Sequence, residues 1–278
     1  MIDVLTNLKY KLDRGSLEQI YFSFIRPKLE YGCHIWDNCT TSNSFALENV
    51  QIKVARIVTG ARKGTSRELL LTELGWPTLG DRRKGFKLKA LINIINKRSP
   101  PYLQSLLPAR GVDRPESRKA NNFKSFKTRS EKFKNSFIPS AISLWNSLSD
   151  EQRSYVYCKE LIQSYCSPLF YLGSRDNNVK HAQLRLKCSK LNQHLYLLHV
   201  IDSPSCLCGN SIEDNNHYLL NCPLYANYRA VLLGSIRSIC GIKITCDILL
   251  YGDPNMDYCA NVNIFNAVHS YIEGTKRL

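Results

Sequence analysis

The chain has 278 residues, and its 38 Lys and Arg residues exceed its 23 Asp and Glu residues by a formal charge of +15. A hydrophobic fraction of 44% is typical of a globular chain and excludes global disorder, and the length predicts one large domain or two. No apolar run approaches the ~20 residues of a membrane-spanning helix, and the residues after Met1 lack the apolar centre of a signal peptide. We therefore expect a protein of the nucleus, the cytoplasm or both, which is not secreted and has no membrane partner.

Helical periodicity dominates residues 1–107. Capping-box patterns at 16–19 and 65–68 each precede an apolar stripe, which predicts two helix starts. Between them, a long stripe of apolar residues ends at Gly60, which we expect at the left-handed position just after a helix. Residues 88–95 carry another stripe, and we expect this helix to have a basic outer face.

Residues 108–136 have little periodicity and many charges, which predicts a basic loop or linker. Residues 137–170 read as a helical continuation of the first lobe, and 171–278 as a second helical region. Further helices are predicted at 139–148, 156–165, 179–186, 191–200, 223–239 and 262–272. The expected fold is mainly α, with two helical lobes joined by a basic irregular segment, the second with a small zinc-stapled turn.

The surplus of positive charge is concentrated in one part of the chain. Residues 82–134 contain sixteen basic and three acidic residues, a net charge of +13. Because few compensating acids lie within this segment, a polyanion is the natural partner to neutralise it. The candidate nucleic-acid contacts are Arg82, Arg83, Lys84, Lys87, Lys89, Arg118, Lys119, Lys124, Lys127, Arg129, Lys132 and Lys134.

Phenylalanines alternate with basic residues in the same segment, at Phe86, Phe123, Phe126 and Phe133. Two interpretations are open. The rings could stack on the bases of a single strand while the cations hold its phosphates. Alternatively, the rings anchor an irregular segment to the core and the lysines only solvate it.

Cys206, Cys208, His217 and Cys222 have the one ligand-like spacing among the eleven cysteines, C-x-C-x8-H-x4-C. Three thiolates and one imidazole suit a closed tetrahedral zinc site, which has a structural role and no open position for catalysis. Gly209 would allow the tight turn that brings the first two sulfurs together. The alternative is three ordinary cysteines beside an unrelated histidine.

Motifs of an active centre are missing from the sequence. It contains no adjacent Asp-Asp pair of a polymerase palm, no phosphate-binding loop and no nucleophile elbow. Asp253 and Asp257 are interpreted as part of a capped turn before the last helix. His181, Arg185 and His194 are weaker candidates for nucleic-acid contact. We expect no catalytic residue and no enzymatic activity in this chain.

Six segments in a fixed order carry a resemblance to a known family. They are LDRGSLEQIYFSFIRPKLEYGCHIWDN (12–38), ENVQIKVARIVTGARKGTSRELLLTELGWPTLGDRR (48–83), SFIPSAISLWNSL (136–148), RLKCSKLNQHL (185–195), DSPSCLCG (202–209) and HYLLNCPLY (217–225). Together they resemble the region after the palm in reverse transcriptases of non-LTR retrotransposons, of the LINE-like, jockey type. The resemblance covers nearly the whole chain.

The resemblance implies an RNA-directed DNA polymerase family in which this region is a helical, thumb-like part followed by a zinc-binding part. It also implies Cys206, Cys208, His217 and Cys222 as the zinc ligands. The family's palm, fingers and endonuclease would precede residue 1, so that an upstream polymerase domain is a possible partner in an intact element. We expect a non-catalytic C-terminal fragment that binds template RNA or DNA. The alternative is a zinc-stapled protein-interaction or scaffold module whose basic tract binds acidic partners.

Overall fold

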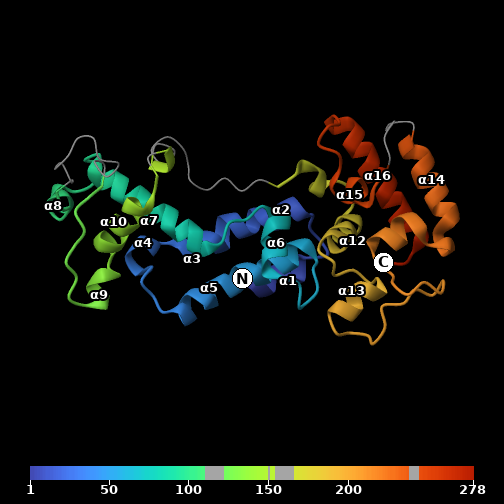
Figure 1. Ribbon diagram of the computed structural model, residues 1–278, viewed down its shortest axis with the longest axis horizontal. Coiled ribbons are helices and arrows are strands. Elements are labelled where there is room, and N and C mark those ends of the chain that lie inside the picture. Colours follow the sequence, from blue (N-terminus) through green and yellow to red (C-terminus); the bar gives the residue numbers. More distant parts are fainter. Residues whose placement is uncertain (110–121, 150, 154–165, 238–243) are drawn as a thin grey trace. The chain divides into compact units, whose positions relative to one another are not determined.

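The computed structural model describes residues 1–109, 122–149, 151–153, 166–237 and 244–278 (Figure 1). These residues form helices joined by turns and contain no β-strand, so the predicted mainly α class is confirmed. Within the same residues, no helix combines the length and the apolar character needed to cross a bilayer. The helix predicted at 156–165 and the candidate contacts Arg118 and Lys119 lie outside the described residues.

The chain divides into two compact units, each discontinuous in sequence. Unit 1 comprises residues 1–25, 52–76 and 165–278, and unit 2 comprises residues 26–51 and 77–164. This division differs from the expected boundaries after residues 107, 136 and 170. Residues 1–25 and 52–76 belong with the C-terminal part of the chain because buried interactions between distant residues join them, and such pairings leave no local pattern in a sequence.

Unit 1 consists of short and medium-length helices and of one long helix, α16. Its elements are α1 (Ile2–Leu8), α2 (Arg14–Ile20), the π-helix η1 (Tyr21–Ile25), the last part of α5 (Thr41–Thr59), α6 (Arg67–Leu74), the 3-10 helix η2 (Pro168–Tyr171), α12 (Arg175–Arg185), α13 (Asn192–Leu197), the π-helix η3 (His217–Asn221), the 3-10 helix η4 (Pro223–Tyr225), α14 (Ala226–Arg237), α15 (Cys246–Tyr251) and α16 (Tyr258–Thr275). α16 packs against α12, α14 and α15 (Figure 1). Fully buried Ile264 and Val268 of α16 lie in the core that these helices share.

Capping residues set several of these helix ends. Asp13 accepts a hydrogen bond from the backbone N–H of Ser16 (2.9 Å), so α2 begins before the predicted box at 16–19. Asp257 caps α16, which confirms the capped turn predicted there. Gly60 has φ +68°, as predicted, and a Cβ at this position would lie 2.4 Å from the side chain of Val179. The close approach of α12 therefore requires glycine at the end of α5.

Unit 2 contains α3 (Arg26–Glu30), α4 (Cys33–Trp36), the first part of α5, α7 (Leu79–Ile95), α8 (Pro101–Ser105), α9 (Glu131–Lys134) and α10 (Phe137–Ser147). α7 packs on both α4 and α10. Leu91 of α7, with Ile142 and Trp145 of α10, forms the centre of its core. The hydroxyl of Thr78 caps α7, which consequently begins well before the apolar stripe at 88–95. The helix is therefore longer than predicted, and its additional first half is rich in basic residues.

Candidate metal centre and candidate nucleic-acid interface

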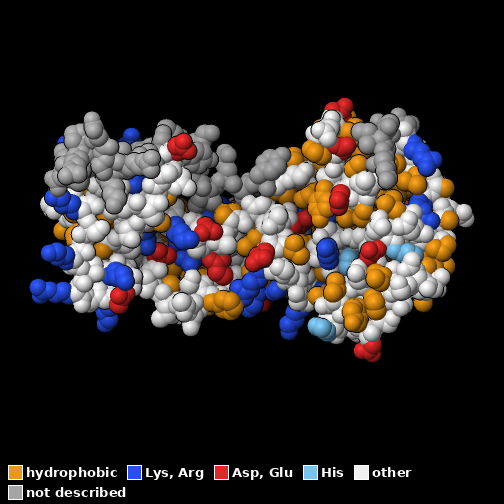
Figure 2. All heavy atoms as spheres, viewed as in Figure 1, with side chains coloured by type: hydrophobic (Ala, Val, Ile, Leu, Met, Phe, Trp, Pro, Cys, Tyr) orange, Lys and Arg blue, Asp and Glu red, His pale blue; other side chains and the backbone are white. Residues whose placement is uncertain are grey.

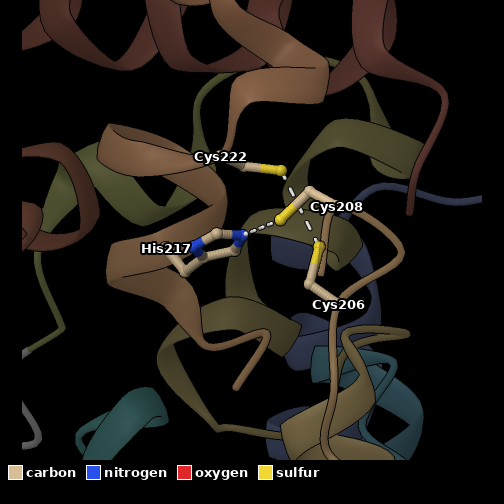
Figure 3. A group of neighbouring side chains, drawn as sticks. All are labelled: Cys206, Cys208, His217 and Cys222. Carbon is tan, nitrogen blue, oxygen red and sulfur yellow. Dashed lines mark hydrogen bonds between the residues drawn. The ribbon is translucent and has the colours of Figure 1, made fainter. Parts of the chain in front are cut away.

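The four predicted ligands, Cys206, Cys208, His217 and Cys222, converge in unit 1 (Figure 3). Their ligand atoms all lie within 4.8 Å of one another. The Cys206 and Cys222 sulfurs are 3.7 Å apart, and the Cys208 sulfur is 3.2 Å from His217 Nε2. A tetrahedral ion with bonds of ~2.3 Å to sulfur separates two sulfur ligands by ~3.8 Å. The cluster therefore has the dimensions to hold a metal ion.

A tight turn brings the first two sulfurs to one side. Cys206 N–H donates to the carbonyl of Asn210 (2.9 Å), and Gly209 N–H donates back to the carbonyl of Cys206 (3.0 Å). Gly209 has φ +93°, and a Cβ there would meet no atom within 4 Å. The turn therefore requires glycine for its backbone conformation and not for space, as the sequence predicts.

A single π-helical turn, η3, supplies the other two ligands. His217 is its first residue, and the N–H of Cys222 donates to the carbonyl of His217 (2.6 Å), which spans five residues. Asp214 accepts from His217 N–H (2.6 Å), and Arg229 donates to the carbonyl of Cys222 (2.7 Å). These contacts hold both ends of the turn. The four residues between His217 and Cys222 match the hydrogen bond between residues i and i+5 that defines a π-turn.

The thiols of the cluster differ in their environments. Burial raises the pKa of the Cys206 thiol to about 12 and also raises that of Cys222. A hydrogen bond from the backbone of Asn210 lowers the pKa of Cys208. Since a thiol binds a metal only as the thiolate, metal binding to this cluster must release protons.

Glu213 connects the ligand loop to the rest of unit 1. Its side chain is 3% exposed, accepts from the backbone N–H of Asn192 (2.8 Å), and pairs with Arg277 at 2.5 Å. Arg277 also donates to the side-chain oxygen of Asn192 (3.0 Å). This group could not be predicted from the sequence, because its members are far apart in the chain and form no motif.

Three of the candidate nucleic-acid contacts point into unit 2. Arg82 pairs with Glu30 (Nη2–Oε2 2.9 Å), while Arg83 and Lys87 pair with Asp37 at 3.0 and 2.6 Å. Each of the three cations is at most 9% exposed. The expectation of a basic outer face is therefore wrong for these residues. Their acidic partners come from α3 and from the end of α4, outside the basic segment.

The other described candidates are exposed: Lys84, Lys89, Lys124, Lys127, Arg129, Lys132 and Lys134. Five of them lie between residues 124 and 134, in and just before α9. Figure 2 shows Lys and Arg side chains projecting from the end of unit 2 that carries α9. Lys84 and Lys134 make ion pairs with Asp81 and Glu131. Such exposed pairs contribute little and exchange readily for another anion.

Two of the phenylalanines of the segment, Phe123 and Phe126, anchor it to the core of unit 2. Phe123 is 6% exposed and belongs to the core of unit 2, and Phe126 packs against that core. The rings of Phe126 and Phe133 meet edge-on, 5.7 Å between centroids. The guanidinium of Arg82 lies over the ring of Phe86, 5.5 Å from its centroid. The structure thus favours the anchoring interpretation over base stacking for Phe123 and Phe126.

The weaker candidates His181, Arg185 and His194 are buried in unit 1 and cannot contact nucleic acid in this fold. His181 Nδ1 lies 3.2 Å from Nε2 of His269, and its Nε2 lies 3.1 Å from a backbone carbonyl. His194 Nδ1 lies 2.8 Å from the hydroxyl of Ser189. The suggestion that these residues bind nucleic acid was wrong, because polar residue types do not by themselves indicate exposure.

Arg185 belongs to a buried ion network that joins distant parts of unit 1. Glu73 of α6 accepts from Arg14 of α2 (3.0 Å) and from Arg185 of α12 (2.9 and 2.7 Å). Arg14 also pairs with Glu18 (3.0 Å), which accepts from the hydroxyl of Tyr171 (2.9 Å). Two cations and two carboxylates therefore balance one another.

Comparison with known proteins identifies no relative. No protein-family model, curated protein or solved structure matches the chain.

Proposed function

We propose that this chain is a non-catalytic nucleic-acid-binding protein. The basic segment of unit 2 would hold RNA or DNA, and the Cys–His cluster of unit 1 would hold structural zinc. The observation that carries the proposal is the group of exposed cations at Lys124, Lys127, Arg129, Lys132 and Lys134, with only Glu131 among them. This group does not include the cations of α7 that are buried and paired with acidic residues.

Contacts in this segment would be made to phosphates. The rings of Phe123 and Phe126 are engaged in the core of unit 2, so that among the rings between residues 123 and 134 only Phe133 is exposed to a base. Phosphate contacts position a nucleic acid without reading its sequence, and they release bound counterions. We therefore expect binding of low sequence specificity that weakens steeply with salt.

Zinc would be held by Cys206, Cys208, His217 and Cys222, whose soft donor set and spacing fit that ion. The ion would supply folding free energy to the loop and to the π-turn, on the order of 10 kcal/mol in small zinc domains. Four protein ligands leave no position for a substrate. The zinc site would therefore be architectural.

The family assignment is part of the same proposal. The fixed order of six similar segments, the mainly α fold and the converged Cys–His cluster support a thumb-like and zinc-binding region of a non-LTR retrotransposon reverse transcriptase. Purified chain should then incorporate no nucleotide in a primer-extension assay on primed RNA. Template-dependent incorporation would refute the non-catalytic role.

The binding proposal is tested with matched triple variants of the full chain. Lys127→Gln/Arg129→Gln/Lys132→Gln should weaken binding to a single-stranded RNA at least tenfold. Its salt dependence (log K against log salt) should become shallower by ~2, from ~0.7 per lost phosphate contact. The control removes three charges from exposed lysines elsewhere: Lys53→Gln, Lys63→Gln and Lys190→Gln.

Equal losses in both triple variants would show that net charge alone drives the binding and would refute a specific segment. RNA binding that is unchanged in the first variant, combined with loss of binding to polyglutamate, would instead favour the scaffold alternative with acidic protein partners. Both titrations use folded protein, checked by circular dichroism.

A further inference from the structure

Unit 1 contains a pocket of 270 Å³, formed between the ends of α1 and α5 and the face of α12. Its charged lining residues are Lys9, Arg56 and Arg175, and no acidic residue lines it. None of its lining residues belongs to the Cys–His cluster or to the basic segment. A pocket that gathers three cations without an acid is unusual inside a compact unit, because like charges repel one another in a poorly solvated site.

Arg175 is held by backbone carbonyls, and the nearest carboxylate influence on it is the charge of Asp13, which forms no ion pair with it. It donates to the backbone carbonyls of Lys9 (3.1 Å), Ile57 (2.8 Å) and Val58 (2.5 Å). Burial lowers the pKa of Arg175 to about 10. Within the described part of the chain, no Asp or Glu forms an ion pair with it. Carbonyl dipoles compensate a desolvated guanidinium only in part, so an anion nearby would stabilise it.

The other two cations are also unpaired within the described residues. Arg56 makes no ion pair there, and its Nε is buried without a hydrogen-bond partner. Lys9 Nζ lies 4.5 Å from the centroid of the Tyr10 ring, a contact that leaves its charge uncompensated. Tyr10 itself is 82% exposed. Within the described residues, none of the three charged side chains that line this pocket makes a direct ion pair, and Asp13, which is not among the lining residues, acts on Arg175 only through its charge.

The negative end of α5 compensates part of the charge of Arg175, because Arg175 donates to carbonyls of its last turn. Arg175 takes the carbonyls of Ile57 and Val58, and Gln183 donates to the carbonyl of Gly60 (2.7 Å). The charged side chains that line the pocket are all cations. This is the reverse of what a bare helix C-terminus would present.

We propose that this pocket binds a phosphate group, with Lys9, Arg56 and Arg175 supplying the positive charge. The volume lies just below the ~300–1,000 Å³ of typical small-molecule sites, which suits a phosphate with an attached sugar. The phosphate could belong to an RNA strand or to a free nucleotide. The site lies in unit 1 and does not rest on the function proposed for the basic segment of unit 2.

Calorimetric titration of the full chain with uridine 5′-monophosphate tests the pocket, with uridine and inorganic phosphate as parallel probes. We expect saturable binding of the nucleotide and none of uridine. Lys9→Gln/Arg56→Gln should reduce the affinity at least tenfold. The matched control, Lys53→Gln/Lys63→Gln, removes the same charge from α5 and the turn after it, outside the pocket lining. Arg175 is left unchanged because its three backbone contacts support the fold.

Absence of nucleotide and phosphate binding would overturn the proposal, and so would equal effects of the two double variants. A second comparison separates the sources of the phosphate: tighter binding of 5′-phosphorylated RNA than of 5′-hydroxyl RNA identifies a strand end. Equal binding of the two RNAs, with nucleotide binding intact, identifies a free nucleotide. The Lys127/Arg129/Lys132 variant should bind the nucleotide normally, so failure of the basic segment and failure of the pocket are distinguishable.

Discussion

Arg277 Nη2 lies 2.5 Å from Glu213 Oε2, and this ion pair joins the C-terminal segment to the loop between the two pairs of candidate metal ligands. Glu213 is nearly fully buried, whereas Arg277 keeps about a fifth of its side chain exposed. The carboxylate also caps the start of α13 through the N–H of Asn192. The pair therefore stabilises the loop between Cys208 and His217 without being part of the Cys–His cluster.

Replacing Arg277 by Ala should lower the free energy of unfolding by ~2–3 kcal/mol, somewhat less than for a fully buried pair, because Glu213 loses its counterion. Urea denaturation of the zinc-loaded chain measures the change. Lys190→Ala, an exposed site in the same unit, should change it by less than ~0.5 kcal/mol. Similar values for the two variants would show that the pair does not stabilise unit 1.

Cys222→Ser should abolish zinc binding, because a hydroxyl is a poor ligand for this ion and three donors remain. Mass spectrometry of metal content under reducing conditions should find one zinc per wild-type chain and none in the variant. Cys259→Ser, which changes an exposed thiol, should retain the metal. Zinc-free wild-type protein would contradict the proposed site.

Glu73→Gln should destabilise unit 1 by ~3–5 kcal/mol, since Arg14 and Arg185 would share a buried site with Glu18 as the remaining carboxylate. Thermal or urea denaturation gives the difference. The matched control is Glu68→Gln on the exposed side of the same helix, α6, and it should change stability little. A Glu73 variant as stable as this control would show that the network contributes nothing to stability.

Acidification should destabilise unit 1 through three buried histidines. Burial lowers the pKa of His194 and His269 to about 4, and burial with the charge of Arg185 holds the pKa of His181 well below its usual value. The unfolded chain binds these protons near pH 6.5, so it binds more protons than the folded chain between about pH 6.5 and 4. Stability is therefore retained above this window and lost as the pH falls through it.

The expected slope is at most ~1.4 kcal/mol per pH unit for each histidine. Urea denaturation at a series of pH values from 7.5 to 5 measures it. His269→Gln removes one titrating group and should make the slope shallower than in the wild type, which separates the histidines from acid-sensitive metal binding. Identical slopes in both proteins would contradict this origin.

Local patterns predicted the helices and the metal cluster well. Gly60 and the helices around it follow from apolar periodicity and glycine conformation, and the four ligands lie within seventeen residues of one another in sequence. Their convergence needs only a tight turn and a π-turn, both short. These features could be predicted because the residues that interact are also close along the chain.

Pairings between distant residues escaped prediction. Arg14, Glu73 and Arg185 look like ordinary surface residues of three separate helices, yet they share one buried network. Arg82 and Arg83 likewise appeared to belong to a solvent-facing basic block, whereas their acids lie on preceding helices. A charge count over a window cannot detect partners outside that window, and burial depends on packing that spacing alone does not encode.

Each unit is built from separate segments of the chain, and this arrangement has a consequence for folding during synthesis. Every residue of unit 2 precedes residue 165, whereas unit 1 combines residues 1–25 and 52–76 with residues 165–278. A ribosome therefore releases a complete unit 2 while residues 1–25 and 52–76 still lack their packing partners. Apolar surface of those two segments therefore stays uncovered on the nascent chain until residues 165–278 have been made, and uncovered surface of this kind is prone to aggregate.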